Sequence, residues 1–343
     1  MNRRTFTTAA LASAAAATLP FGARAADTFR IIITETETPL VPNSVEDLAL
    51  RLGYYKKAGV DVELIRVSQT PSAIAALRSG QGDMANVATD TVLQLVGRNQ
   101  MRLRAVISPD KALPLTIVAK SAIKQPKDLQ GKTFGVARVG SIDYEMTRLV
   151  LAKYGVDVDK LQYLAIGQPP IRAQALVAGQ IDATAISVGI WTTMPDRRGL
   201  SVLVDQPDFY KAAPFISKLS VVTDTVAKTK AQQVGAVVRA IILASRDFAK
   251  NPSLWVNAMA AARPDVKRSD LEALAVIYRK SWSVNGGLNL DSLRFTADTL
   301  YRTSPDFKDL RRVEPGDWID MSFINAVLRT TGNNPNIDVS GRG

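Results

Sequence analysis

Short apolar runs alternate with amphipathic stretches along residues 29–222, which is the pattern of strands and helices taken in turn. Residues 29–34 (FRIIIT) form a buried-type strand, whereas Val45, Leu48, Ala49 and Leu52 recur at the spacing of one helix face. Since strand, helix and strand in this order build right-handed parallel crossovers, the pattern predicts an α/β fold. Further strands are expected at residues 60–67, 83–88, 103–107, 115–119, 133–136, 161–166, 182–188, 202–204 and 215–222.

The chain beyond residue 222 has a helical period instead. Residues 230–250 predict a long amphipathic helix, and shorter helices are expected at 253–262, 270–282, 290–302 and 319–329. Ser44 and Asp47 have the spacing of a capping box ahead of the first helix. Residues 333–343 have no apolar period, so a frayed end is expected there.

Residues 128–154 form the segment around which the rest is organised. An apolar strand at 133–136 leads into a turn bounded by Gly140, and Ser141 stands where an amphipathic helix should start. A strand, a tight turn and a helix start place several unpaired N–H groups around one point, which suits an anion or a carbonyl oxygen. The alternative for Ser141 is a helix cap and nothing more.

An internal repeat indicates two related halves. Residues 76–83 (ALRSGQGD) match residues 175–182 (ALVAGQID), and each copy follows a helix that starts at proline. Gly80 and Gly179 suit the left-handed position that ends a helix. One copy would be an ordinary α/β junction, but two copies at equivalent places predict duplicated lobes. Ligands in open α/β sheets bind beyond the carboxyl ends of strands, so a cleft between the lobes is the expected site.

The N-terminus predicts export. Residues 1–4 are basic, residues 9–19 are mildly apolar, and residues 23–25 (ARA) fit a cleavage site, so residues 1–25 are interpreted as a signal peptide. The arginine pair at positions 3 and 4 partly matches a twin-arginine signal, and the general secretory route remains the alternative. Cleavage removes three arginines and no acid, which lowers the net charge from +11 to +8. A periplasmic location without a lipid anchor is expected.

The amino-acid composition limits which catalytic groups and metal ligands the chain can provide. The chain has no Cys and no His, which rules out disulfides, thiolate nucleophiles, imidazole ligands and Ser-His-Asp catalysis. Basic residues are scattered among acids instead of forming a block with aromatics, so no nucleic-acid partner is expected. An enzyme would depend on carboxylates, and Asp83 and Asp182 are the obvious pair. Both lie at strand starts, away from the cleft. Catalytic residues, a metal site and cofactors are therefore not expected.

The chain resembles the periplasmic substrate-binding proteins of ABC importers in the nitrate, sulfonate and taurine group, the NMT1/THI5-like family. The resemblance covers about residues 29–260. It rests on residues 53–62 (GYYKKAGVDV), 76–85 and 175–183, and on residues 128–132 (DLQGK) followed by Gly135, Val136, Gly140 and Ser141. One branch of that family, the pyrimidine synthases, consumes a histidine and uses a cysteine-rich iron motif. This chain has neither residue, which excludes that branch.

The resemblance implies a two-lobed periplasmic-binding-protein-like fold (type II), each lobe a central sheet flanked by helices, with two hinge-crossing segments. Residues 26–112 and 218–343 would form the first lobe, and residues 113–217 the second. A monomer is expected that delivers a small molecule to an ABC permease with a cytoplasmic ATPase. The expected ligand-binding residues lie mainly at strand ends and helix starts: Thr34, Glu35, Thr89, Arg138, Gly140, Ser141, Ile142, Gln168, Ser187 and Trp191.

The ligand itself is less closely defined. Ser141 at a helix start and Arg138 favour a sulfonate or a carboxylate. Glu35 and Glu37 would repel an anion unless they point away, and they fit an ammonium group, a zwitterion or a nitrogenous heterocycle such as a pyrimidine or thiamine precursor. Trp191 either stacks on a flat ligand or packs between the lobes. A TRAP-type carrier or a membrane sensor remains an alternative client, and an exported enzyme the weakest alternative.

Overall fold

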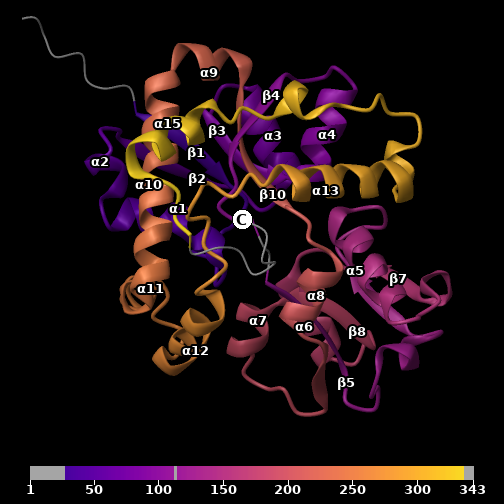
Figure 1. The fold of residues 1–343 in the computed structure, drawn as a ribbon. Coiled ribbons are helices and arrows are strands. Elements are labelled where there is room, and N and C mark those ends of the chain that lie inside the picture. The colour runs from indigo at the N-terminus through magenta and orange to yellow at the C-terminus, as the bar shows by residue number, and fades with distance from the viewer. Residues whose placement is uncertain (1–27, 112–113, 336–343) are drawn as a thin grey trace, which may run out of the picture.

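Two five-stranded sheets organise the described chain. The computed structural model describes residues 28–111 and 114–335, so the expected signal peptide and most of the expected frayed end lie outside the described residues. The first sheet contains β1 (Phe29–Ile33), β2 (Val62–Arg66), β3 (Met84–Ala88), β4 (Leu103–Ile107) and β10 (Lys218–Thr223). The second contains β5 (Leu115–Lys120), β6 (Thr133–Val136), β7 (Gln162–Ala165), β8 (Ala183–Ser187) and β9 (Leu200–Val204). Figure 1 shows the two sheets in separate halves of the molecule.

Both sheets have the same topology. The strand orders are β2-β1-β3-β10-β4 and β7-β6-β8-β5-β9, and in each the fourth strand runs antiparallel to its two neighbours. The chain passes from the first sheet to the second between β4 and β5 and returns between β9 and β10. These are the two expected crossings. We call the halves built around the first and second sheets lobe 1 and lobe 2.

The repeated segment is the clearest sign of this symmetry. Gly80 and Gly179 end equivalent helices at φ values of 73° and 75°, where a side chain would be strained. The aspartates that follow have matching roles, since each accepts a hydrogen bond from a backbone N–H near the start of the adjacent strand, at 2.9 Å for Asp83 and 3.0 Å for Asp182. Each also pairs with a lysine, at 2.9 and 2.8 Å respectively. Both carboxylates thus stabilise the strand starts, at the end of each sheet opposite the carboxyl ends of its parallel strands.

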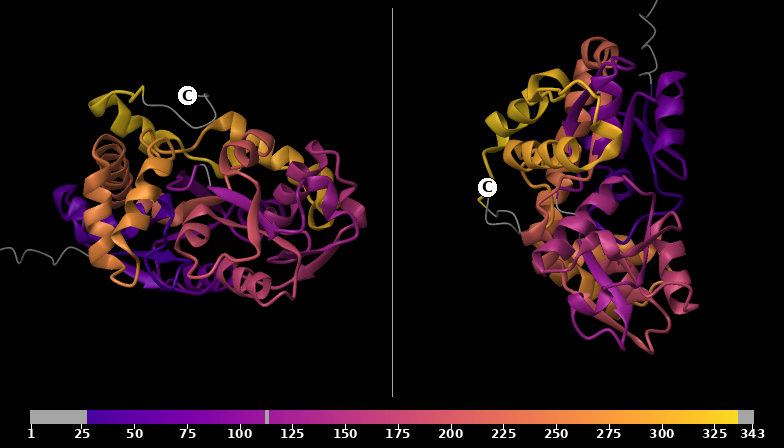
Figure 2. Two further views of the ribbon diagram at one scale, coloured as in Figure 1. Left: turned by 90° about the horizontal axis from the view of Figure 1, so that it is seen from below. Right: turned by 90° about the vertical axis from the view of Figure 1, so that its right-hand side faces the viewer.

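Helices cover both sheets, and the tail adds a further layer on one side of lobe 1 (orange to yellow in Figure 2). Lobe 1 contains α1 (Val45–Arg51), α2 (Tyr54–Lys57), α3 (Thr70–Arg78) and α4 (Thr89–Gly97). Lobe 2 contains α5 (Ile142–Lys153), α6 (Pro169–Val177), α7 (Val188–Thr193) and α8 (Gln206–Ala212). The tail contains α9 (Asp224–Thr229), α10 (Ala231–Lys250), α11 (Pro252–Ala262), α12 (Arg268–Tyr278), α13 (Leu290–Thr303), α14 (Pro315–Trp318) and α15 (Ser322–Thr331).

Apolar packing holds each lobe together and also joins the tail to lobe 2. The largest core cluster combines lobe 1 with the tail helices, and separate clusters fill lobe 2. Two tail helices contact lobe 2, because α12 packs against α7 and α13 packs against α5 (Figure 1). Across the described residues, no helix combines the length and the apolar character that crossing a membrane requires.

The predicted capping box before α1 does not form. Ser44 has helical backbone angles and makes no side-chain cap hydrogen bond. Its hydroxyl instead accepts a hydrogen bond from the indole N–H of Trp255, at 3.0 Å. Asp47 pairs with Arg66. Both side chains of the predicted capping box are therefore bound to partners distant in the sequence instead of to the start of α1.

Candidate functional site

The carboxyl ends of the parallel strands in both sheets face the boundary between the lobes. The turn after β6 brings Arg138 to Asp90, at the start of α4 in lobe 1, with 3.9 Å between Nη2 and Oδ2. Val188, which follows β8, is buried within the core cluster of lobe 1. The ends of β3, β6 and β8 therefore meet at one interlobe boundary, and we treat that boundary as the candidate site.

Two predicted residues lie at the rim of this boundary in lobe 1. Thr34 and Glu35 follow β1, and the Lys218 ammonium lies 3.0 Å from Thr34 Oγ1 and 2.7 Å from Glu35 Oε1. Burial would lower the pKa of Lys218, but the neighbouring carboxylates outweigh that effect and raise it. Lys218 therefore stays charged and neutralises Glu35. Glu37 is also paired, with Arg263 at 3.1 Å.

Thr89 is hydrogen-bonded to the second crossing, the segment between β9 and β10. Its hydroxyl donates to the carbonyl of Ile216 at 2.6 Å, and its amide donates to the carbonyl of Ser217 at 2.9 Å. The side chain is fully buried. Thr89 thus ties the start of α4 to the second crossing, where hinge motion would occur.

The turn ahead of α5 contacts lobe 1 through Arg138 and Gly140. Besides its approach to Asp90, Arg138 pairs with Asp306 at 2.9 Å. The Gly140 carbonyl accepts a hydrogen bond from Ser304 Oγ at 3.2 Å. One turn further along α5, Glu145 Oε2 accepts from Thr303 Oγ1 at 2.6 Å. This row of contacts, which we call the latch, connects lobe 2 to the end of α13 and the residues after it.

Ser141 is the backbone N-cap of α5 but makes no side-chain cap hydrogen bond. Its Oγ lies 2.5 Å from both the Arg138 carbonyl and Asp143 Oδ1. The hydroxyl therefore closes the turn. The first-turn amides, beginning with Ile142, have no partner within the helix by its geometry. Ser141 and Ile142 are both buried.

The other predicted residues of lobe 2 are more dispersed. Ser187 ends β8 and caps α7, with Oγ accepting from the Ile190 amide at 3.2 Å. Trp191 is half-buried in α7, and the Arg197 guanidinium lies 5.3 Å from its ring. Gln168 is exposed at the start of α6. Its carbonyl accepts from the Ile171 amide at 3.0 Å, and among the described residues none of its hydrogen bonds reaches the latch or the rim.

The start of α7 packs tightly against lobe 1. A Cβ at Gly189 would lie 2.1 Å from the carbonyl oxygen of Leu40, so only glycine fits this approach. That same carbonyl accepts a hydrogen bond from the Tyr278 hydroxyl at 2.7 Å, and the Gly189 amide hydrogen-bonds the Tyr278 oxygen. Lobe 2 therefore packs directly against α12 and against the loop after β1.

Sequence reasoning missed the most unusual polar groups here, which are two acids beneath the rim. Glu46 and Asp110 are each 1% exposed, and one carboxyl oxygen of each, Oε2 and Oδ1, has no hydrogen-bond partner among the described residues. Burial raises the pKa of Glu46 to about 8 and that of Asp110 to about 7. Both acids interact electrostatically with Lys218 and with each other.

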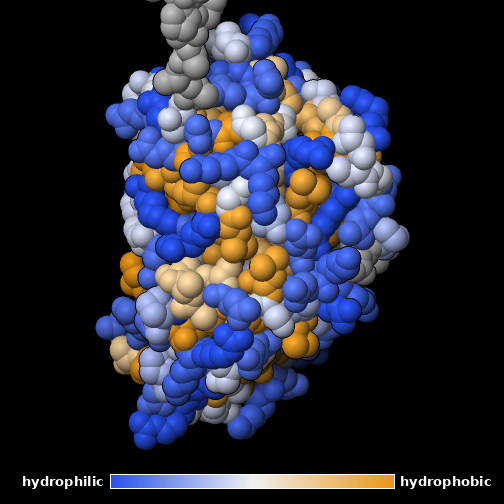
Figure 3. All heavy atoms as spheres, turned by 90° about the vertical axis from the view of Figure 1, so that its left-hand side faces the viewer, coloured by the Kyte–Doolittle hydropathy of each residue, from blue (hydrophilic) through white to orange (hydrophobic). Residues whose placement is uncertain are grey.

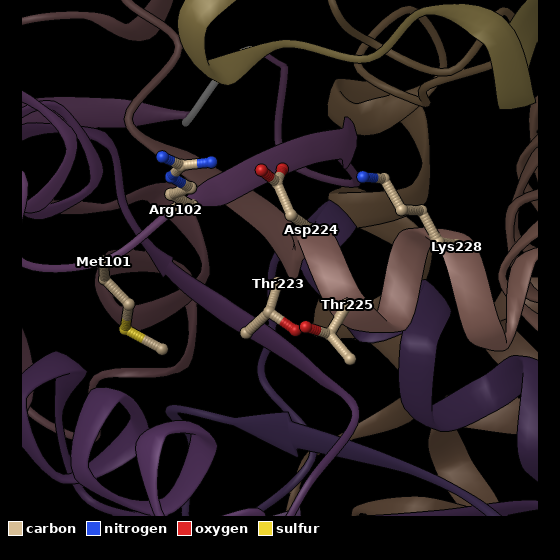
Figure 4. Close-up of a pocket in the computed structure, with 6 residues that line it drawn as sticks. All are labelled: Met101, Arg102, Thr223, Asp224, Thr225 and Lys228. Atoms are coloured by element: carbon tan, nitrogen blue, oxygen red, sulfur yellow. The ribbon is translucent and has the colours of Figure 1, made fainter.

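Two cavities lie elsewhere. One of about 390 Å³ is at the opposite end of the first sheet, where Asp224 lies between Arg102 and Lys228 (Figure 4). Asp224 also pairs with Arg104 at 2.6 Å, so the cavity holds no unpaired acid. The other, of about 720 Å³, lies between α10, α15 and the turn after α2. The face that includes α2 and α10 mixes apolar and hydrophilic residues (Figure 3). Neither cavity is lined by a predicted site residue.

Two sheets of one topology, two crossings and a polar boundary define a two-lobed periplasmic-binding-protein-like fold of type II. The chain belongs to the family described as NMT1/THI5 like, whose model matches residues 48–254. No curated protein matches the chain.

Solved structures with the same fold come from several organisms. The alkanesulfonate-binding protein SsuA from Xanthomonas axonopodis pv. citri, bound to MOPS, is 18% identical at a TM-score of 0.66, covering 85% of this chain and 98% of that one. The periplasmic nitrate-binding protein NrtA from Synechocystis PCC 6803 is 11% identical at 0.70, covering 92% of each chain. A ligand-binding component of an ABC-type import system from Staphylococcus aureus, with zinc bound, is 13% identical at 0.69, covering 88% and 98%.

Proposed function

We propose that this chain is the periplasmic solute receptor of an ABC importer, closing its two lobes on a small organic ligand and delivering it to a membrane permease. Family membership and the fold support the class. The observation that carries the mechanism is the latch, in which Arg138, Gly140 and Glu145 of lobe 2 contact lobe 1. We take these contacts as features of the closed state, so a ligand that adds contacts to both lobes shifts the population toward that state.

The proposed ligand carries a sulfonate or a carboxylate. The first-turn amides of α5 and the positive end of its dipole support this choice, because they are oriented to accept negative charge. The pairing of Glu35 with Lys218 and of Glu37 with Arg263 removes the repulsion that these acids would otherwise exert. The similar alkanesulfonate-binding and nitrate-binding proteins are consistent with an anion.

A thermal-shift screen of sulfonates, carboxylates, nitrate and pyrimidines tests the proposal. A ligand that binds the folded state alone raises the melting temperature with its concentration. The expected result is a saturable shift with one compound class, stoichiometric binding and no turnover. Consumption of a compound would indicate an enzyme instead, and a screen with no shift in any class would count against a receptor for these solutes.

The membrane transporter that receives the ligand and the route of export are parts of the same proposal. An ABC permease with its ATPase is the proposed partner and a monomer the proposed state, with residues 1–25 directing export to the periplasm. Permease and ATPase genes beside this one would support that partner. A gene for a large membrane carrier in their place would favour a TRAP-type system.

A further inference from the structure

We propose that the interlobe boundary contains a subsite for a positively charged nitrogen group of the ligand, formed by the carboxyl groups of Glu46 and Asp110. This inference rests on the proposed receptor function and narrows its ligand. The bound group is an ammonium or amidinium nitrogen, whose N–H donors fit acceptor oxygens that have no protein donor.

Unsatisfied acceptors are the first observation. Within residues 28–111 and 114–335, Glu46 Oε2, Asp110 Oδ1 and Asn43 Oδ1 have no hydrogen-bond partner, and all three residues are at least 98% buried. A buried polar atom without a partner costs free energy that folding alone does not recover. One buried acceptor without a hydrogen-bond donor is not unusual by itself. Here two of the three, on Asn43 and Glu46, belong to one hydrogen-bonded network, and Asp110 interacts electrostatically with Glu46, which together indicate donors that arrive with a ligand.

A hydrogen-bonded chain connects two of these residues, Asn43 and Glu46. Asn43 Nδ2 lies 3.5 Å from Asn86 Oδ1, Asn86 Nδ2 donates to Ser220 Oγ at 3.2 Å, and Ser220 Oγ donates to Glu46 Oε1 at 2.8 Å. The chain joins the residues before α1 to β3 and β10. It fixes the Glu46 carboxyl group in place and leaves its second oxygen available.

Charge balance is the second observation. Three carboxyl groups, those of Glu35, Glu46 and Asp110, interact with the single ammonium of Lys218, which already pairs with Glu35 at 2.7 Å. The neighbouring Asp47 is paired with Arg66. In the part of the chain that the structure describes, Glu46 and Asp110 therefore make no ion pair of their own. A ligand cation would supply the counter-charge, whereas an anion placed there would add to the repulsion.

The position of these acids connects them to lobe closure. Asp110 interacts electrostatically with Tyr278, whose hydroxyl is hydrogen-bonded to Leu40 in lobe 1 and to Gly189 in lobe 2. The acids thus lie beneath the contact that forms when the lobes meet. A nitrogen group held by them is placed where lobe 2 can enclose it.

Two matched series test the subsite by thermal shift and calorimetry: aminopropanesulfonate, propanesulfonate and propylamine, and γ-aminobutyrate, butyrate and butylamine. Within a series that binds, the amine-bearing compounds should bind at least tenfold more tightly than the compound with only the anion. Binding at pH 7 should release protons, because a nearby cation lowers the pKa of both acids.

Variants assign the effect to the two side chains. Glu46→Gln and Asp110→Asn should each lower amine affinity at least tenfold and reduce proton release, whereas Glu272→Gln, an exposed acid on α12, should change neither. If a compound with only the anion binds as tightly as its amine partner, or if amine binding survives both variants, the subsite is wrong while the receptor function stands. If no amine shifts the melting temperature, the subsite is also wrong, and the broader solute screen then decides the receptor function separately.

Discussion

The guanidinium of Arg138 in lobe 2 lies 3.9 Å from the carboxylate of Asp90 in lobe 1, across the boundary where the proposed ligand is enclosed. Asp90 is buried, one of its carboxyl oxygens has no hydrogen-bond partner in the described part of the chain, and burial raises its pKa to about 6. Arg138 is half exposed and also pairs with Asp306. One arginine therefore connects a buried acid and a surface acid of lobe 1 to the turn that starts α5.

Breaking the latch should weaken closure modestly. Arg138→Ala removes two contacts of a half-exposed side chain, and exposed ion pairs contribute about 0.2–1 kcal/mol each. Ligand affinity should fall about two- to fivefold, and small-angle scattering should show a more open ligand-free protein. Arg294→Ala is the control, since that arginine pairs with exposed Asp291 in the same tail, which is its one ion pair among the described residues. Equal scattering for the two variants would mean that the Arg138 contacts do not bias the lobes.

A single methyl group should hold the lobes apart. The Cβ of Gly189→Ala would lie 2.1 Å from the Leu40 carbonyl oxygen, which is far inside contact distance. The variant should keep both lobes folded but lose at least tenfold in ligand affinity, about 1.4 kcal/mol or more. Gly316→Ala is the control, because nothing lies within 4 Å of its added Cβ. Titration calorimetry measures the difference, and unchanged affinity in the Gly189 variant would contradict the closed arrangement.

The Ser141 hydroxyl should matter for binding more than for stability. It makes no cap hydrogen bond, so Ser141→Ala should destabilise the fold by less than the roughly 1 kcal/mol typical of a lost cap. Ligand affinity should fall, because the turn that presents the first amides of α5 loses the hydrogen bonding of the Ser141 hydroxyl and keeps only its backbone bond. Thr223→Ala removes a genuine cap of α9 at the far end of the first sheet and should show the reverse pattern. Denaturant unfolding and calorimetry together separate the two effects.

Stability of the ligand-free protein should depend on Glu46 above pH 5. Its folded pKa of about 8 exceeds the ordinary value of 4.5, so the folded state binds more protons than the unfolded state between these values. This carboxyl group therefore reduces stability progressively as pH rises from about 4.5 to 8. Glu46→Gln removes that loss. The free energy of unfolding of this variant, relative to that of the parent, should therefore be higher at pH 8 than at pH 5 by about 2 kcal/mol or more. A variant with the same pH profile as the parent would show that Glu46 is not a buried, uncompensated acid.

The pattern of strands and helices in the sequence was sufficient to predict the fold. Apolar runs of buried parallel strands, glycine stops and the repeated segment ending at Asp83 and Asp182 are local features, and local physics determines them. Short helices without a long apolar period, such as α7 and α9, were missed. The sequence also predicted a cap at Ser44, where a tertiary partner 211 residues away, Trp255, takes the hydroxyl instead.

The site was predictable only in part. Strand ends can be located from the sequence, so Thr34, Thr89 and Ser187 could be selected, and their role in binding remains a prediction. Glu46 lies among the polar residues of an amphipathic helix, where exposure is the ordinary expectation. Its burial depends on β10, which returns from lobe 2 to supply Ser220 and Lys218. Such contacts between distant segments leave no periodic signal.

Distance between the lobes tests the central claim most directly. The chain has no cysteine, so Lys56→Cys in lobe 1 and Asp159→Cys in lobe 2 provide two unique sites for a fluorophore pair. Titration with the compound that raises the melting temperature should increase energy transfer, saturating at one ligand per chain, and Gly189→Ala should abolish the increase. A compound that binds with one-to-one stoichiometry while energy transfer stays constant would contradict capture by lobe closure.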